Sequence, residues 1–324
     1  MRFGTVALIG RSNVGKSTFL NAVLDEELAI VSPLPQTTRD TLLGVVTREE
    51  AQLAFLDTPG LHRPKSELGR RMNHAALEAA RGTDVVVLMT SIPSGPHERG
   101  PADVVSAEDR AIIARLPAAS ATPTLLVINK VDVLRDKGRL LPLIEAFSAL
   151  HAFRAVIPTS MRQNDGVERV IAELIDVLPE GEPGYPPDTL TDKPTRYFVR
   201  EFVREQVLRA VRGEVPHAVA VSLERFEEGP VARISATIHV EKVGQRKILV
   251  GDGGSMIRSI GTEARARIER FLAQRVHLEL FVRVTPRWKN APRMLAELGY
   301  AKSEAADSGA KADAEFDVEP ESTK

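Results

Sequence analysis

One loop near the N-terminus, GRSNVGKS at residues 10–17, limits more than any other feature what this chain can fold into. It matches the pattern G-x-x-x-x-G-K-[ST] and lies between the apolar run Val6–Ile9 and a helical stretch that begins near Lys16. Glycines at both ends let the backbone curl with its N–H groups facing inward, and the helix N-terminus adds partial positive charge. This order predicts an α/β P-loop domain in which Lys16 reaches the β- and γ-phosphates. The expected nucleotide contacts in the loop are Arg11, Ser12, Asn13, Val14, Gly15, Lys16, Ser17 and Thr18.

A second motif, DTPG at residues 57–60, directly follows the apolar run Leu53–Leu56. Alone it would be an ordinary turn, but after a phosphate loop it is typical of a sensor of magnesium and the γ-phosphate. We expect Asp57 to hold Mg²⁺ through a water molecule and the Gly60 N–H to contact the γ-phosphate. The Ser17 hydroxyl would ligate the ion directly.

A third motif, NKVD at residues 129–132, follows the run Leu125–Ile128 and indicates which base is bound. The Asp132 carboxylate can accept hydrogen bonds from N1–H and N2–H₂ of guanine, and adenine has no such pair of donors on that edge. Asn129 and Lys130 would brace the loop and pack on the base. The motif therefore favours GTP and GDP as ligands and argues against a P-loop kinase or ATPase.

The polar, proline-flanked segment QTTRD at residues 36–40 is where a loop would supply a threonine to Mg²⁺ once GTP is bound. We expect this ligand to be Thr38, with Thr37 as the competing candidate. The expected catalytic residues are then Lys16, Thr38 and Gly60, and the expected magnesium ligands are Ser17, Thr38 and Asp57.

The segment Thr159–Met161 follows the apolar run Ala155–Ile157. We expect the backbone N–H groups of Ser160 and Met161 to close over guanine O6. A Ser160 that caps a turn would explain the same residues without any ligand.

The chain divides into two domains, a linker and a tail. In residues 1–180, runs rich in Val, Ile and Leu alternate with helical stretches, which predicts a mostly parallel sheet flanked by helices. Proline and glycine crowd the stretch PEGEPGYPP at 179–187, so we place a linker at residues 181–193. Residues 194–300 predict an α+β module, and the acidic residues 301–324 are expected to be disordered.

Charge is unevenly distributed along the chain. Residues 185–300 contain 20 Lys and Arg against 14 Asp and Glu, whereas residues 1–184 contain 20 against 23 and residues 301–324 contain 3 against 7. A basic segment between two acidic ones suggests a polyanionic partner, although a solvated surface reaches the same charge by chance. The chain has no cysteine, which excludes disulfides and thiolate metal sites and fits a reducing cytoplasm. The apolar start of the chain is too short to span a membrane.

A second glycine-rich loop, Gly251, Asp252, Gly253 and Gly254, joins two predicted helices in the basic segment. Because side chains are small or absent there, a sugar-phosphate backbone could approach closely at the N-terminus of the next helix. A helix-capping turn beside a solvated arginine face is the alternative. The expected phosphate partners around this loop are Arg246, Lys247, Arg258, Arg265, Arg287 and Lys289.

With these motifs in order, the first domain resembles the translation-factor class of small GTPases. The segment 249–272 resembles the G-x-x-G helix–loop–helix of a KH domain, and 191–208, 214–221 and 282–300 extend the similarity to the bacterial Era GTPases over roughly residues 3–300. This resemblance implies a type II KH domain that binds the 3′ end of small-subunit ribosomal RNA, and a role in maturation of the 30S subunit. It also implies a monomer in the cytoplasm, in some cases peripherally associated with the inner membrane.

The chain departs from the family pattern in three places. Asp252 stands where the family usually has Lys, which replaces a phosphate attraction with a repulsion. Met161 stands where Ala is usual, but its backbone N–H remains. The loop Thr90–Ser106 is longer and richer in Pro and Gly than its equivalent, and we expect a mobile surface insertion.

Leu61 follows DTPG where Ras-type enzymes carry a water-positioning glutamine, so intrinsic hydrolysis should be slow unless another group supplies charge. The resemblance implies a potassium ion held by Asn13 in that role, although an Asn13 that only caps the loop is the alternative. A constitutive RNA-binding protein whose nucleotide domain merely stabilises the fold is a further alternative, disfavoured by the intact Lys16, Ser17 and Asp57.

Overall fold

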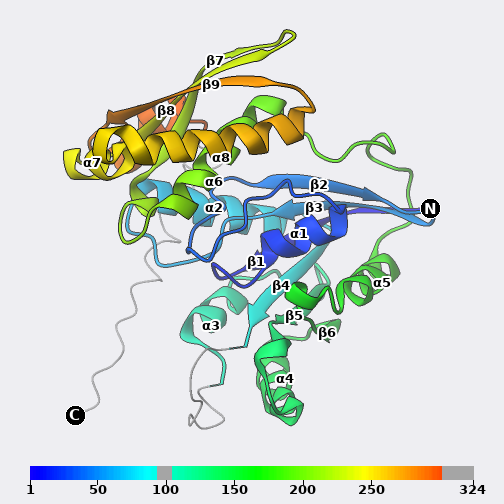
Figure 1. The fold of residues 1–324 in the computed structure, drawn as a ribbon. Helices are drawn as coiled ribbons and strands as arrows, with labels where there is room; N and C mark the ends of the chain where they lie inside the picture. The colour runs from blue at the N-terminus through cyan, green and yellow to red at the C-terminus, as the bar shows by residue number, and fades with distance from the viewer. Residues whose placement is uncertain (93–103, 301–324) are drawn as a thin grey trace, which may run out of the picture.

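The computed structural model describes residues 1–92 and 104–300, and Figure 1 shows an N-terminal domain beneath a smaller C-terminal module. The first domain is built on a six-stranded sheet in the order β2-β3-β1-β4-β5-β6, in which only the β2–β3 pairing is antiparallel. Its elements are β1 (Arg2–Gly10), α1 (Lys16–Leu24), β2 (Leu42–Thr47), β3 (Ala51–Asp57), α2 (Glu67–Arg81), β4 (Val85–Ser91), α3 (Ala107–Ile113), β5 (Thr124–Asn129), α4 (Leu140–Ser148), β6 (Ala155–Pro158) and α5 (Val167–Val177).

The alternation of this domain follows from burial of the sheet on both faces. The run Val6–Ile9 in β1 is completely buried, with alternate residues in two separate cores. One core contains side chains of α1 and α5, and the other contains side chains of α2, α3 and α4. The predicted strands and flanking helices of an α/β P-loop domain are therefore confirmed, and β2 is a strand additional to the apolar runs named above.

The C-terminal module is a three-stranded sheet with its helices on one face. The strand order is β7-β8-β9, with β7 antiparallel and β9 parallel to β8, and α6 and α8 share the buried cluster beneath it. This helix–strand–strand–helix–helix–strand order is that of a type II KH domain, as predicted. The elements are α6 (Thr195–Ala210), β7 (Ala220–Glu227), β8 (Ala232–Val240), α7 (Val243–Val250), α8 (Ser255–Leu272), β9 (Val276–Val284) and α9 (Pro292–Glu297).

The chain between α5 and α6 runs along the edge of the first domain. The Gly181 N–H donates to Met1 O (3.1 Å) and the Val45 N–H donates to Leu190 O (2.9 Å). The Gln52 side chain exchanges two hydrogen bonds with the backbone of Tyr185, at 2.8 and 2.9 Å. These contacts fix the path of the segment predicted as a linker along the first domain.

Two predicted segments lie largely outside the described residues. The tail at 301–324 is entirely outside them, as is the central part (93–103) of the predicted insertion. At the ends of that insertion, Thr90 and Ser91 complete β4, and Ser106 caps α3 by accepting a hydrogen bond from the Asp109 N–H (3.0 Å).

Candidate functional site

The phosphate loop connects β1 to α1 in a conformation that requires its glycines. Gly10 has φ 151° and Gly15 has φ 112°, both outside the range that other residues adopt easily. A Cβ on Gly10 would lie 2.1 Å from Met89 O, and one on Gly15 would lie 2.2 Å from the side-chain nitrogen of Asn129. Neighbouring strands therefore press directly against the loop and set its curvature.

Lys16 lies inside this loop and is almost completely buried. Its ammonium donates to Gly10 O (3.1 Å) and Arg11 O (3.0 Å). Burial lowers the pKa of Lys16 to about 8, and the nearby charge of Asp57 opposes that shift. The loop thus holds a buried, weakly compensated cation, which suits a ligand that brings negative charge.

Three oxygen-bearing side chains meet beside Lys16. Ser17 Oγ donates to Asp57 Oδ2 (2.6 Å) and lies 2.8 Å from Thr38 Oγ1. Asp57 Oδ1 is buried and has no hydrogen-bond partner among the described residues. Burial raises the pKa of Asp57 to about 6, against the opposing effects of Lys16 and Ser17. A carboxylate with an unused oxygen and two hydroxyls is a donor set that fits Mg²⁺.

The structure distinguishes the two candidate threonines. Thr38 is the residue whose hydroxyl meets Ser17, whereas the Thr37 hydroxyl donates to Leu34 O (2.7 Å) within its own loop. Both threonines border the same cavity. The arrangement expected from the sequence, with Thr38 beside Ser17 and Asp57, is therefore the one that the structure brings together.

The loop containing Asn129 connects the phosphate loop to the segment 159–161. Asn129 Nδ2 donates to Val14 O (2.8 Å), and Lys130 Nζ donates to Asn13 O (2.7 Å). The Met161 N–H, expected to face guanine O6, instead donates to Asn129 Oδ1 (3.0 Å). In this structure, then, that N–H braces the loop.

Asp132 accepts a hydrogen bond from Ser160 Oγ through Oδ1, at 2.7 Å. The Ser160 N–H, expected to face guanine O6, donates instead to Asp165 O (3.0 Å). The Ser160 hydroxyl makes no capping hydrogen bond and holds the Asp132 carboxylate, which borders the cavity. Held in this way, Asp132 is oriented before any base arrives.

The cavity has a volume of about 570 Å³, and its lining beyond the predicted residues includes Ile30, Val31, Ser32, Pro33, Gln36, Val133 and Arg162.

The segment after Asp57 packs tightly against the phosphate loop. A Cβ on Gly60 would lie 2.6 Å from the Ser12 backbone, so only glycine fits at this position. The next residue, Leu61, is buried in the core with Ile9 and Ala76, and cannot orient a water molecule. Ser12 Oγ is buried without a partner among the described residues, which leaves a further polar atom for a ligand.

The second glycine loop is open where the first is closed. Gly253 and Gly254 have φ 57° and 78°, and a Cβ on either would meet nothing within 4 Å. Only Gly251 is constrained, since its Cβ would lie 2.8 Å from Met256. Asp252 is exposed, so its charge faces any approaching phosphate.

The predicted phosphate partners of this module differ in their surroundings. Lys289 is paired with Glu241 at 2.8 Å, so its charge is already balanced inside the module. The others are exposed: Arg246, Lys247, Arg258, Arg265 and Arg287.

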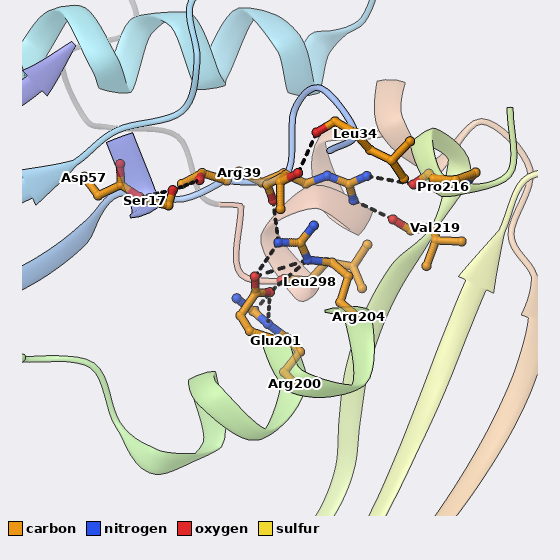
Figure 2. Close-up of polar contacts among 12 residues, drawn as sticks. Ser17, Leu34, Arg39, Asp57, Arg200, Glu201, Arg204, Pro216, Val219 and Leu298 are labelled. Carbon is orange, nitrogen blue, oxygen red and sulfur yellow. Dashed lines mark hydrogen bonds and ion pairs between the residues drawn. The ribbon is translucent and has the colours of Figure 1, made fainter. Parts of the chain in front are cut away.

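Sequence reasoning missed a set of charged residues between the two domains. Arg39, Glu201 and Arg204 are each at most 8% exposed, and their contacts join the Thr38 loop to α6 and to the start of β7. Figure 2 shows this set beside Ser17 and Asp57. An arginine directly after Thr38 was the available signal, but its partners are backbone carbonyls, which no sequence motif indicates.

Comparison with known proteins agrees with both halves of the chain. The family described as 50S ribosome-binding GTPase matches residues 5–130, and the KH domain family matches residues 214–289. GTPase Era of Ruminiclostridium cellulolyticum is 41% identical over 299 residues, which cover 92% of this chain and 97% of the relative. GTPase Era of Lacticaseibacillus paracasei is 43% identical and covers 92% of this chain and 96% of the relative.

Two solved structures share the whole fold. An Aquifex aeolicus Era variant bound to GDP·AlF₄⁻ is 34% identical, covers 93% of this chain and 100% of its own, and superposes with a TM-score of 0.85. Era in complex with MgGDPNP and nucleotides 1506–1542 of 16S ribosomal RNA is 34% identical, covers 93% and 99%, and has a TM-score of 0.86.

Fold and motifs together define a P-loop GTPase that carries a C-terminal KH domain. More specifically, the extent and identity of the similarity show that the chain belongs to the GTPase Era family. It is therefore an enzyme that hydrolyses GTP to GDP and phosphate, with Mg²⁺ as its metal ion.

Proposed function

We propose that this GTPase is a switch that binds the 3′ end of small-subunit ribosomal RNA and acts in maturation of the 30S subunit. The observation that carries the proposal is the loop at 251–254, where Gly253 and Gly254 leave open space between two helices that carry the exposed Arg246, Lys247 and Arg258. A bare loop at a helix N-terminus suits the close approach of a sugar-phosphate backbone. Similarity to an Era protein solved with part of 16S ribosomal RNA supports the same class of ligand.

We infer that the cavity above the phosphate loop is the guanine-nucleotide site. The phosphate loop would hold the phosphates, and all of its residues from 12 to 18 except the buried Val14 border the cavity. Asp132 would accept hydrogen bonds from the base, and Asn129 and Lys130 would keep their loops in place. Lys16 would balance charge that develops on the γ-phosphate, while the Gly60 N–H would orient it.

We infer further that Ser17, Thr38 and Asp57 are the magnesium-binding residues. When bound, Mg²⁺ supplies positive charge against the β- and γ-phosphate oxygens. Ser17 Oγ already lies within hydrogen-bond distance of both Thr38 Oγ1 and Asp57 Oδ2, so little rearrangement is needed to hold the ion.

Crosslinking in cells followed by sequencing of the bound RNA tests the main proposal. Reads should concentrate at the 3′ end of small-subunit ribosomal RNA, and enrichment of unrelated transcripts would contradict it. A turnover assay with purified protein separates the switch from the constitutive RNA-binding alternative, since that alternative requires no GTP hydrolysis.

A potassium ion at Asn13 is a second element of the proposal. The buried Leu61 leaves the transition-state charge without a side-chain partner from that position. Asn13 has φ 63°, and its side chain donates to Pro33 O (2.7 Å), which fixes the amide at the mouth of the cavity. Hydrolysis should be faster in potassium than in sodium at equal ionic strength, and Asn13→Ala should remove the difference. Equal rates for the wild type would exclude the cation.

We also propose that the protein is a monomer in the cytoplasm and makes peripheral contact with the inner membrane. Across residues 1–92 and 104–300, no helix is long and apolar enough to cross a membrane. Sedimentation tests the monomer, and fractionation of cells at low and high salt tests the peripheral contact, which should be lost at high salt.

A further inference from the structure

Residues 37, 38 and 39 of the Thr38 loop are held alternately by the two domains. Figure 2 labels Arg39 and Arg204, through which the KH domain takes part. The carbonyl of Thr37 accepts a hydrogen bond from Arg204 Nη2 (2.6 Å) on α6 of the KH domain. The hydroxyl of Thr38 lies 2.8 Å from Ser17 Oγ in the magnesium site. Arg39 then donates to the carbonyls of Val219 and Pro216, again in the KH domain. The residue between two KH-domain anchors is therefore the one expected to contact the metal ion.

The first anchor is rigid because Arg204 is itself held. Glu201, one turn earlier on α6, accepts from Arg204 Nε (3.1 Å) and Nη2 (2.5 Å). Burial alone would raise the pKa of Glu201, but the charges of Arg204 and Arg200 lower it below its ordinary value, so the pair is ionised. Arg204 is 1% exposed, which leaves its guanidinium little freedom to follow a moving Thr37.

The second anchor is equally enclosed. The Arg39 guanidinium lies 5.6 Å from the centre of the Trp288 ring, and Arg39 is 8% exposed. Trp288 is fully buried and donates through Nε1 to Ala218 O (2.8 Å), next to the carbonyl that Arg39 binds. A planar donor stacked on a fixed ring is difficult to replace by any other cation.

We propose that Arg204 is a positioning residue for the Thr38 loop, and that the KH domain thereby raises the preference of the nucleotide site for GTP over GDP. The contact of Thr38 with the metal ion is needed only when the γ-phosphate is present. A loop held at Thr37 and Arg39 is already close to that arrangement, so GTP binding orders less backbone. The inference rests on the proposed nucleotide site, and GDP needs no such ordering.

The test uses the full chain and compares dissociation constants for GDP and for a non-hydrolysable GTP analogue, both with Mg²⁺. The variant is the pair Arg204→Met with Glu201→Leu, which removes the donor to Thr37 without leaving a buried, unpaired carboxylate. Arg209→Met is the matched control, because Arg209 lies on the same helix, is 59% exposed in its side chain and, among the described residues, pairs with Glu205 on that helix.

We expect the double variant to bind the GTP analogue about tenfold more weakly while GDP binding changes less than about twofold, a selective loss of GTP preference. Arg39→Lys, which keeps the charge but loses the planar donor, should act in the same direction and serves if the double variant does not fold. Equal losses for both nucleotides, or none for either, would overturn the inference. Failure of the wild type to bind either nucleotide would instead refute the proposed site.

Discussion

Two glycine loops in this molecule are expected to face phosphate groups, and they are built in opposite ways. In the loop at 10–15, a side chain on Gly10 or Gly15 would collide with Met89 or Asn129. In the loop at 251–254, a side chain on Gly253 or Gly254 would meet nothing within 4 Å. Residues of the protein enclose the first loop and fix its shape, whereas the second loop is open and would be enclosed only by a bound partner.

This difference determines how each site should respond to change. Around the first loop, Lys16, Asp57 and Asn129 are buried and bonded to one another or to the loop, so loss of one group leaves others unpaired. Around the second, the charges are exposed and water and salt screen them. We therefore expect steep, selective effects in the nucleotide site and small, graded effects in the RNA-facing loop.

The largest effect is expected for Asp132→Asn. The new amide can no longer accept two hydrogen bonds from guanine, and GTP affinity should fall about 10³-fold, with preference moving toward xanthine nucleotide. Competition between GTP and xanthosine triphosphate measures this. Asp136→Asn, on the exposed turn that follows, is the control and should bind GTP normally. If guanine preference persists in Asp132→Asn, the assignment of this loop is wrong.

The next effect joins the two sites. Because the Thr38 loop contacts both Ser17 and Arg204, a bound γ-phosphate should alter the KH domain. We expect GTP to raise RNA affinity over GDP by roughly 5–150-fold, and by linkage RNA should raise GTP affinity equally. RNA titrations in saturating GDP and in a saturating GTP analogue measure the RNA affinity of the two nucleotide states. Matching dissociation constants would mean that the domains are only tethered.

The same contrast explains what could be predicted from the sequence. The three motifs at 10–17, 57–60 and 129–132 have fixed spacing because each occupies the end of one strand of a parallel sheet, so fold and nucleotide site followed from them. Thr38 was identified differently, from its place in a polar, proline-flanked segment that follows the phosphate loop and its helix. The loop at 251–254 was identified by composition, which indicates an open turn but not its partner.

The domain interface could not be predicted because its contacts connect distant residues through backbone atoms. Arg204 and Thr37 are 167 positions apart, and Arg39 and Val219 are 180 apart.

Strand β2 was missed for a local reason. Its Gly44, where a Cβ would lie 2.6 Å from Leu20, interrupts the short apolar run that would otherwise indicate a strand.

A smaller effect is expected from pH. Rising pH should lower the stability of the nucleotide-free protein but strengthen Mg²⁺-dependent GTP binding. Burial raises the pKa of Asp57 to about 6, whereas the unfolded chain releases this proton near 3.8. Stability of the nucleotide-free protein should therefore fall as pH rises from about 4 to 6. Magnesium needs the carboxylate, so Mg²⁺-dependent GTP binding should weaken about tenfold per unit as pH falls below about 6. Titrations at pH 5, 6 and 7 with and without Mg²⁺ test this, and parallel curves would contradict it.

The smallest effects are expected in the loop at 251–254, where single exposed charges act through water. Asp252→Lys should tighten RNA binding and Gly253→Asp should weaken it, each by about fivefold or about 1 kcal/mol, since the first reverses one side-chain charge and the second adds one on an exposed surface. At Gly253 the φ of 57° is one that Asp tolerates better than most residues, so the change should act through charge and bulk rather than through unfolding. Glu228 is an exposed acid in the turn between β7 and β8. Glu228→Lys is therefore the matched control for Asp252→Lys and should leave RNA affinity nearly unchanged.

Both loop effects should shrink with added salt, because each phosphate that a cation neutralises releases counterions. If Gly253→Asp binds RNA like the wild type in filter-binding titrations at low salt, the RNA does not cross this loop, and the comparison between the two glycine loops would no longer hold.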